Sequence, residues 1–199
     1  MTEESYFLMK IVLLGDGAVG KTALRARFLG QGFDFANYSV TIGADFVIRE
    51  QSIRNPAPSS LDEPETMVKF QIWDIAGQPR FSELRKLYYR GALGGLLLFD
   101  VSRRSSTESL RNWTTEFFAH NGRGPMPIIL VGNKIDLRQE LPDALTTEDG
   151  ETLAAELRDL PELQNSTAFV KYLETSARTG ENVEQAFQLL GETILDSMH

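Results

Sequence analysis

Residues 15–22 of this chain, GDGAVGKT, have the types and spacing that bind a phosphate group. They fit the pattern G-x-x-x-x-G-K-[ST], in which glycine lets the backbone wrap closely around an anion. Lys21 can reach the β- and γ-phosphates of a nucleotide, and the Thr22 hydroxyl can ligate Mg²⁺. The alternative is an ordinary glycine-rich turn with a surface lysine. The residues expected to contact the nucleotide are Gly15, Gly17, Ala18, Val19, Gly20, Lys21, Thr22 and Ala23.

The segments on either side of this loop favour the phosphate-binding interpretation. Residues 7–14, FLMKIVLL, form an apolar run that is typical of a buried strand, and residues 23–29, ALRARFL, are predicted to form a helix. A loop between a strand and a helix places the backbone N–H groups of the helix start against the anion. A simple turn would require neither the preceding strand nor the following helix, so it is the weaker interpretation.

A second polar segment, residues 74–78, follows a predicted strand over 68–73. The carboxylate of Asp74 could approach Mg²⁺ there, although Asp also favours strand-ending turns. Gly77 offers a backbone N–H that could meet a γ-phosphate. The amide of Gln78 both donates and accepts hydrogen bonds, so it could orient a water molecule for in-line attack. Beside a phosphate loop, the functional interpretation is the stronger one.

A third polar segment, Asn133-Lys134-Ile135-Asp136, could select the base of a nucleotide. The Asp136 carboxylate can accept hydrogen bonds from N1–H and the 2-amino group of guanine, whereas adenine lacks the 2-amino group. The stem of Lys134 can lie along the base. After a predicted strand over 170–175, the backbone N–H of Ala177 could donate to guanine O6. As a lone tetrapeptide the Asn-Lys-x-Asp motif would be a polar turn, but it follows a buried strand.

The predicted elements form an α/β domain that can bring these segments together. Strands are expected at residues 7–14, 44–49, 68–73, 94–101, 127–132 and 170–175, and helices at 23–29, 82–90, 106–120, 147–160 and from 183 onward. This order predicts a mostly parallel six-stranded sheet with helices on both faces and one antiparallel hairpin. Ligands of such sheets bind at the carboxyl ends of the strands, where all the polar segments lie. We expect one domain over residues 6–198, after an extension of residues 1–5.

The composition excludes several classes of protein. With 199 residues, a net charge of −8 and no cysteine, the chain has no disulfide, thiolate metal site or broad basic surface for nucleic acid. No apolar run reaches membrane-spanning length, and the acidic start is not a secretory signal. The chain also lacks the terminal glycine and cysteine of lipid anchors. We therefore expect a cytoplasmic protein, with any membrane association indirect or through a missing C-terminal tail.

As a set, the motifs resemble the small GTPases of the Ras superfamily, and the Rab branch best. The resemblance covers nearly the whole chain and implies a P-loop NTPase fold with GTP or GDP and Mg²⁺ as ligands. It also implies a molecular switch that hydrolyses GTP slowly and regulates membrane traffic or a related cytoplasmic process. Effectors, a GTPase-activating protein and an exchange factor would contact its two switch segments, and the protein would be a monomer. The resemblance rests on residues 15–22, 41–46, 73–78, 88–92, 133–136 and 174–177.

The resemblance also implies roles for individual residues. Gln78, Lys21 and Thr41 would be catalytic, and Thr22, Thr41 and Asp74 would hold Mg²⁺. Thr41 would touch the γ-phosphate only in the GTP state. Further nucleotide contacts would come from Phe33, Tyr38, Thr41, Gly77, Asn133, Lys134, Asp136, Ser176, Ala177 and Arg178.

Several departures from the Rab pattern keep other functions open. Ile75 and Pro79 stand beside the expected catalytic glutamine, and Pro79 stiffens the backbone there. A guanine-nucleotide scaffold with little hydrolysis is the main alternative, and a P-loop kinase for a small metabolite is a weaker one. We identify no clear catalytic arginine: Arg80 is a poor candidate, and Arg103-Arg104 is expected to be a solvated turn. Unaided hydrolysis should then be slow, roughly 10⁻⁴ to 10⁻³ s⁻¹.

Overall fold

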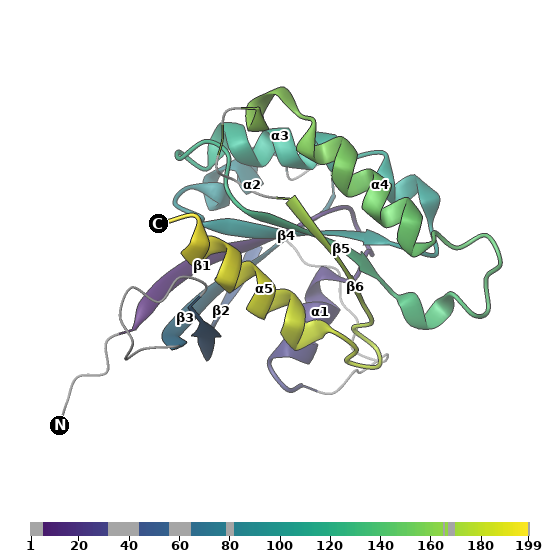
Figure 1. Ribbon diagram of the computed structural model, residues 1–199, viewed down its shortest axis with the longest axis horizontal. Helices are drawn as coiled ribbons and strands as arrows, with labels where there is room; N and C mark the ends of the chain where they lie inside the picture. Colours follow the sequence, from purple (N-terminus) through teal and green to yellow (C-terminus); the bar gives the residue numbers. More distant parts are fainter. Residues whose placement is uncertain are drawn as a thin grey trace.

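The computed structural model describes residues 6–31, 44–55, 65–78, 82–164, 166 and 170–198. These residues form a six-stranded sheet with helices on both faces (Figure 1). The strands are β1 (Phe7–Leu14), β2 (Ala44–Arg54), β3 (Glu65–Ile75), β4 (Gly94–Asp100), β5 (Ile128–Asn133) and β6 (Val170–Thr175). The α-helices are α1 (Lys21–Phe28), α2 (Ser82–Tyr89), α3 (Leu110–His120), α4 (Thr147–Arg158) and α5 (Val183–Asp196).

The strand order is β2-β3-β1-β4-β5-β6. Only β2 runs antiparallel to its neighbour, and the other pairs are parallel. The predicted α/β class and mostly parallel sheet are therefore confirmed. The hairpin is longer than expected, because β2 and β3 pair from Ala44 with Ile75 to Arg54 with Glu65. Polar and apolar residues alternate less clearly in residues 50–54 and 65–67 than in the rest of the hairpin, so the sequence pattern did not predict these residues as strand.

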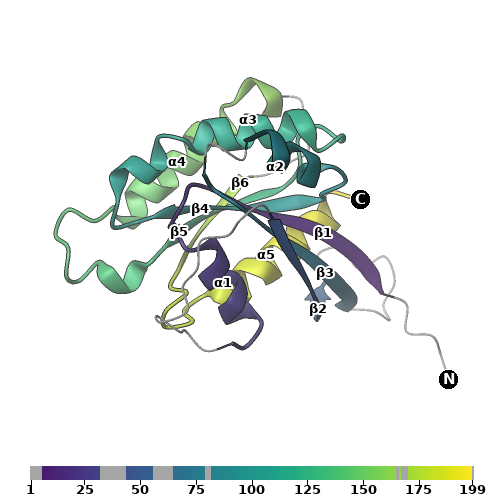
Figure 2. The same ribbon diagram turned by 180° about the vertical axis from the view of Figure 1, so that it is seen from behind.

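Helices cover the sheet in two groups that bury separate parts of the core. Helices α1 and α5 lie on one face, and α2, α3 and α4 lie on the other (Figures 1 and 2). The rings of Phe28 in α1 and Phe187 in α5 stack with centroids 3.7 Å apart. Helix α5 buries an apolar face that comprises Val183, Phe187, Leu190 and Ile194.

The start of α3 corrects the sequence prediction. The sequence predicts a helix over residues 106–120, but a 3₁₀ turn occupies Arg104–Thr107 and α3 begins at Leu110. Ser109 stands at the N-cap without capping through its side chain. Its hydroxyl instead donates to the Asp16 carboxylate at 2.7 Å. A contact between distant segments thus replaces the local cap that the sequence suggested.

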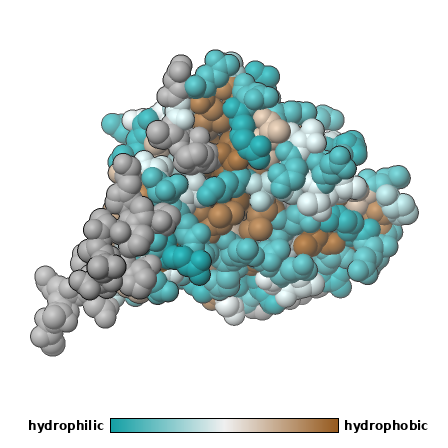
Figure 3. All heavy atoms as spheres, viewed as in Figure 1, coloured by the Kyte–Doolittle hydropathy of each residue, from teal (hydrophilic) through white to brown (hydrophobic). Residues whose placement is uncertain are grey.

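The surface is largely polar on the face shown in Figure 3, where apolar side chains gather in a few limited areas. Within the described parts of the chain, the helices are too short or too polar to cross a membrane. Residues 32–43, between α1 and β2, and residues 56–64, between β2 and β3, lie outside the described residues.

Candidate nucleotide site

The carboxyl ends of the parallel strands bring the predicted polar segments to one edge of the sheet. The phosphate loop follows β1, Asp74 lies near the end of β3, and Asn133 ends β5. Ser176 follows β6 directly. Side chains from segments more than 100 residues apart make direct contact here, since Asn133 donates to the Val19 carbonyl at 2.9 Å.

The phosphate loop has a backbone shape that depends on glycine. Gly15 and Gly20 have φ values of 123° and 103°, a left-handed region that favours glycine. A Cβ atom on Gly15 would lie 2.3 Å from the carbonyl oxygen of Leu98 in β4, and one on Gly20 would lie 2.2 Å from the Asn133 amide nitrogen. These glycines therefore allow the loop to lie directly against β4 and β5.

Lys21 lies across the loop rather than in solvent. Its ammonium donates to the carbonyl oxygens of Gly15 at 2.6 Å and Asp16 at 2.8 Å. Burial lowers the pKa of Lys21 to about 8, although the Asp74 and Asp16 carboxylates act in the opposite direction. A phosphate beside this ammonium would favour its charged form. The site thus holds a positive charge that an anionic ligand would stabilise.

Asp74 and Thr22 have the chemistry of a Mg²⁺ site. The Thr22 hydroxyl donates to Asp74 Oδ2 at 2.6 Å, while Asp74 Oδ1 is buried and has no hydrogen-bond partner among the described residues. Burial raises the pKa of Asp74, and the Thr22 hydrogen bond and the Lys21 charge lower it. Mg²⁺ is commonly held by one or two protein groups together with substrate phosphates. The residues therefore fit the ion, although the described residues contain no cluster of three or more acidic, His or Cys ligands.

The segment after β3 lies against the phosphate loop. A Cβ atom on Gly77 would lie 2.6 Å from both the Gly17 backbone nitrogen and the Lys21 ammonium. Only glycine leaves room for such a close approach of two backbones. Gln78 follows directly and is half-buried; its role in orienting a water molecule stays a prediction.

At the other end of the site, polar side chains hold one another in place. Asn133 Oδ1 accepts from the Thr175 hydroxyl at 3.0 Å and from the Ala177 N–H at 3.1 Å. The Ser176 hydroxyl donates to Asp136 at 2.6 Å, and Arg178 lies 3.6 Å from the same carboxylate. The Ala177 N–H, expected to meet guanine O6, is thus already donated to Asn133, and a base would have to share it.

Lys134 joins this end to the phosphate loop. Its ammonium donates to the Ala18 carbonyl at 2.8 Å and to the Asp100 carboxylate at 2.6 Å. Lys134 itself has a left-handed φ of 70°. This strained backbone and the two contacts fix the long side chain across the site, where its stem can face a bound base.

Comparison with known proteins identifies the family. The sequence model of the Ras family matches residues 10–196. The chain belongs to the Ras family. GTP-binding protein YPT52 of Saccharomyces cerevisiae is 36% identical, over 94% of this chain and 82% of its own length. Ras-related protein RABE1e of Arabidopsis thaliana is 38% identical, over 94% and 75%. Ypt/Rab-type GTPase ypt7 of Pyricularia oryzae is 35% identical, over 98% and 86%.

These relatives make the chain a Rab-like small GTPase, and the Rab resemblance is confirmed. Three of the predicted nucleotide residues, Phe33, Tyr38 and Thr41, lie outside the described residues, as do Pro79 and Arg80. The structure brings the others to one edge of the sheet. They are Gly15, Gly17, Ala18, Val19, Gly20, Lys21, Thr22, Ala23, Asp74, Gly77, Gln78, Asn133, Lys134, Asp136, Ser176, Ala177 and Arg178.

Sequence reasoning missed a support for the phosphate loop of this Ras-family protein. Asp16 Oδ1 accepts from the Trp113 indole N–H at 2.8 Å as well as from Ser109. The Arg85 guanidinium of α2 lies over the Trp113 ring, 4.2 Å from its centroid. A buried indole N–H usually has a partner, and that requirement was the available signal.

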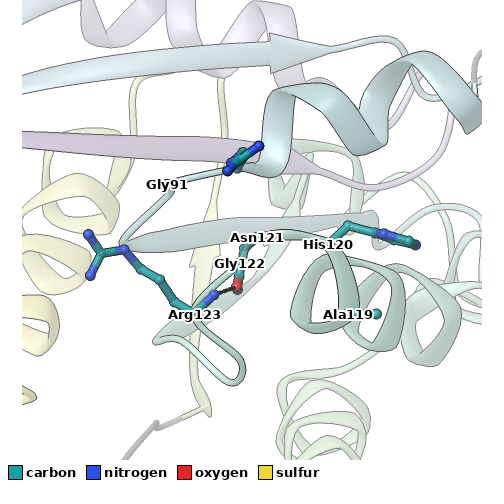
Figure 4. Close-up of a pocket in the computed structure, with 7 residues that line it drawn as sticks. Gly91, Ala119, His120, Asn121, Gly122 and Arg123 are labelled. Atoms are coloured by element: carbon teal, nitrogen blue, oxygen red, sulfur yellow. Dashed lines mark hydrogen bonds between the residues drawn. The ribbon is translucent and has the colours of Figure 1, made fainter.

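A cavity of about 600 Å³ lies elsewhere, beside the C-terminal ends of α2 and α3. Figure 4 shows His120 and Arg123 extending in opposite directions from it. The Asn121 side chain accepts from the Arg123 N–H and donates to the Gly124 carbonyl, so it stabilises the turn. These side chains do not converge on a ligand, and His120 ends α3 as the sequence predicts.

Proposed function

We propose that this Rab-like protein is a molecular switch that binds GTP or GDP with Mg²⁺ and hydrolyses GTP. The observation that carries the proposal is the group formed by buried Lys21 and Asp74 with Thr22, in which one carboxylate oxygen has no partner in the described part of the chain. A buried ammonium and an unpaired carboxylate are costly unless a ligand completes them. In a nucleoside triphosphate with Mg²⁺, the phosphates complement the ammonium and the metal ion complements the carboxylate.

Different residues of the site would bind the nucleotide and promote its hydrolysis. Lys21 would stabilise negative charge on the β- and γ-phosphates, and Gln78 would orient the attacking water. Thr22 and Asp74 would hold Mg²⁺, which when bound neutralises charge on the phosphate oxygens. Asp136 would select guanine, supported by Ser176. We assign further contacts to Phe33, Tyr38 and Thr41 from the family pattern alone.

The cellular setting follows from the family. We propose a cytoplasmic, monomeric protein of one domain over residues 6–198 that acts at a membrane surface in traffic or a related process. Effectors, an activating protein and an exchange factor would bind the switch segments around Thr41 and after Gly77. The net charge of −8 argues against nucleic acid as a partner.

Single-turnover hydrolysis tests the proposal. The protein is loaded with GTP and Mg²⁺, and the conversion to GDP is followed by chromatography from the first minute to several hours, with Gln78→Leu as the matched variant. We expect slow conversion in the natural protein and clearly slower conversion in the variant. Tight GTP binding without any conversion would instead support the scaffold function, and a preference for ATP would support a kinase.

A further inference from the structure

A positively charged side chain lies on the phosphate loop outside the predicted site. Arg103, in the segment after β4, donates through Nη2 to the carbonyl oxygen of Gly17 at 2.9 Å. The two residues are 86 positions apart in the sequence. Arg103 is half-buried, whereas the next residue, Arg104, is exposed. Both arginines thus keep contact with solvent, as expected of a solvated turn, but Arg103 also contacts the phosphate loop.

Gly17 marks the end of the loop where a γ-phosphate would lie. A Cβ atom on Gly77 would come within 2.6 Å of the Gly17 nitrogen and of the Lys21 ammonium. A lysine in this position reaches the β- and γ-phosphates. Nη2 of Arg103 lies 2.9 Å from the carbonyl oxygen of Gly17, so the guanidinium is held beside the residue that borders that place.

The Arg103 guanidinium is also available for a ligand. Among the described residues it forms no ion pair, and it donates to a neutral carbonyl. Two other cations near this edge are paired with carboxylates: Arg25 with Asp45 and Lys134 with Asp100, both at 2.6 Å. Hydrogen bonds between two charged groups are roughly twice as strong as neutral ones. Exchange of the carbonyl for a phosphate oxygen is therefore favourable for Arg103.

We propose that Arg103 is a catalytic residue that contacts the γ-phosphate during GTP hydrolysis. This inference rests on the proposed function. The water oxygen bonds to the γ-phosphorus and the bond from phosphorus to the β–γ bridging oxygen breaks. One water proton stays on inorganic phosphate and the other enters solvent, so that GDP and phosphate are the products. The guanidinium remains protonated and stabilises the negative charge that spreads over the transferred group.

An arginine supplied within the chain changes the expected rate. Ras without its activator turns over at about 3–5 × 10⁻⁴ s⁻¹, whereas Gα proteins with an arginine in cis reach about 10⁻² s⁻¹. We expect the natural protein to lie closer to the second value, and removal of Arg103 to slow hydrolysis roughly ten- to thirty-fold.

Three variants separate catalysis from support of the loop. Arg103→Ala should lose the rate and keep the affinity for GDP and GTP within about threefold, and Arg103→Lys should restore little, because an ammonium lacks the planar donor fork. Arg104→Ala is the matched control, since Arg104 is 70% exposed and lies 3.8 Å from Asp149. It should hydrolyse GTP at the natural rate. A change of less than twofold in Arg103→Ala, or a parallel loss of nucleotide affinity, would overturn the proposal.

A transition-state analogue provides a second readout. Fluoroaluminate binds beside GDP only where the charge of the transferring phosphoryl group is stabilised, so the GDP-loaded protein should bind it alone, as measured by ¹⁹F NMR. Arg104→Ala should bind it and Arg103→Ala should not. Equal binding by both variants, or none by the natural protein, would contradict the role of Arg103. Normal GDP binding in these samples would show that the proposed function itself still holds.

Discussion

The two ends of the candidate site differ in how completely they are paired. At the base end, Asn133, Asp136 and Ser176 are held by hydrogen bonds of 2.6–3.1 Å to one another and to their neighbours. At the phosphate end, Lys21 rests on neutral carbonyls and Asp74 keeps one buried oxygen without a partner. The base end is therefore formed in advance, whereas the phosphate end is completed by its ligand. Substitutions at the base end should then reduce the selectivity for guanine, and substitutions at the phosphate end should remove most of the nucleotide affinity.

The largest effect should come from removing the central charge of the phosphate end. Lys21→Ala should weaken GDP binding about 1,000-fold, because it removes hydrogen bonds between an ammonium and phosphate oxygens. Titration with a fluorescent GDP measures the loss. Lys10→Ala is the control, since Lys10 donates to the Arg90 carbonyl outside the site. Equal losses in the two variants would mean that the effect is not local.

At the base end, Asp136→Asn should weaken GDP binding about 100-fold through the loss of two charge-assisted hydrogen bonds. Xanthosine diphosphate carries an oxygen in place of the 2-amino group, so the new amide should bind it better than the natural protein does. Competition binding of the two nucleotides checks this exchange. If the variant lost both nucleotides equally, Asp136 would be a structural residue and not a selector.

The free energy of unfolding should depend on pH through Lys21 at the phosphate end. The Lys21 pKa falls from 10.5 to about 8 in the folded protein. Between these values the unfolded chain binds more protons at this residue, so the free energy of unfolding should rise with pH. The expected gain in nucleotide-free protein is about 2 kcal/mol from pH 8 to 9.5.

Urea unfolding at several pH values measures this slope, with Lys21→Met as the control for other titrating groups. The rise should be absent from the variant and smaller with GDP bound, because the phosphates favour the charged lysine. An identical slope in the natural protein and Lys21→Met would exclude Lys21 as its source.

A smaller effect is expected at the support of the loop. Trp113→Phe keeps the ring but removes the indole hydrogen bond to Asp16, which should cost about 1 kcal/mol and speed GDP release about fivefold. Displacement of fluorescent GDP by excess unlabelled GDP gives the rate. Trp73→Phe is the matched control, because the Trp73 indole N–H has no partner in the described structure. Faster GDP release from Trp73→Phe than from Trp113→Phe would refute the supporting role of Trp113.

Apolar runs and local motifs in the sequence predicted most of the fold. The strands at 7–14 and 170–175 have the predicted bounds. Their bounds can be recognised from the neighbouring residues alone. The start of α3 was wrong because Ser109 bonds to Asp16, 93 positions earlier in the chain. Arg103 and Trp113 were missed as site residues for the same reason: their contacts with the phosphate loop join distant segments and leave no local pattern.

Calorimetry with GDP and GMP tests most directly whether the phosphate end supplies the affinity of this site. Both nucleotides present the same guanine to Asp136, but only GDP carries the β-phosphate that Lys21 can reach. With Mg²⁺ present, we expect GDP to bind at least 1,000-fold more tightly than GMP. Affinities within tenfold of each other would contradict the account, because the base end would then supply most of the binding free energy.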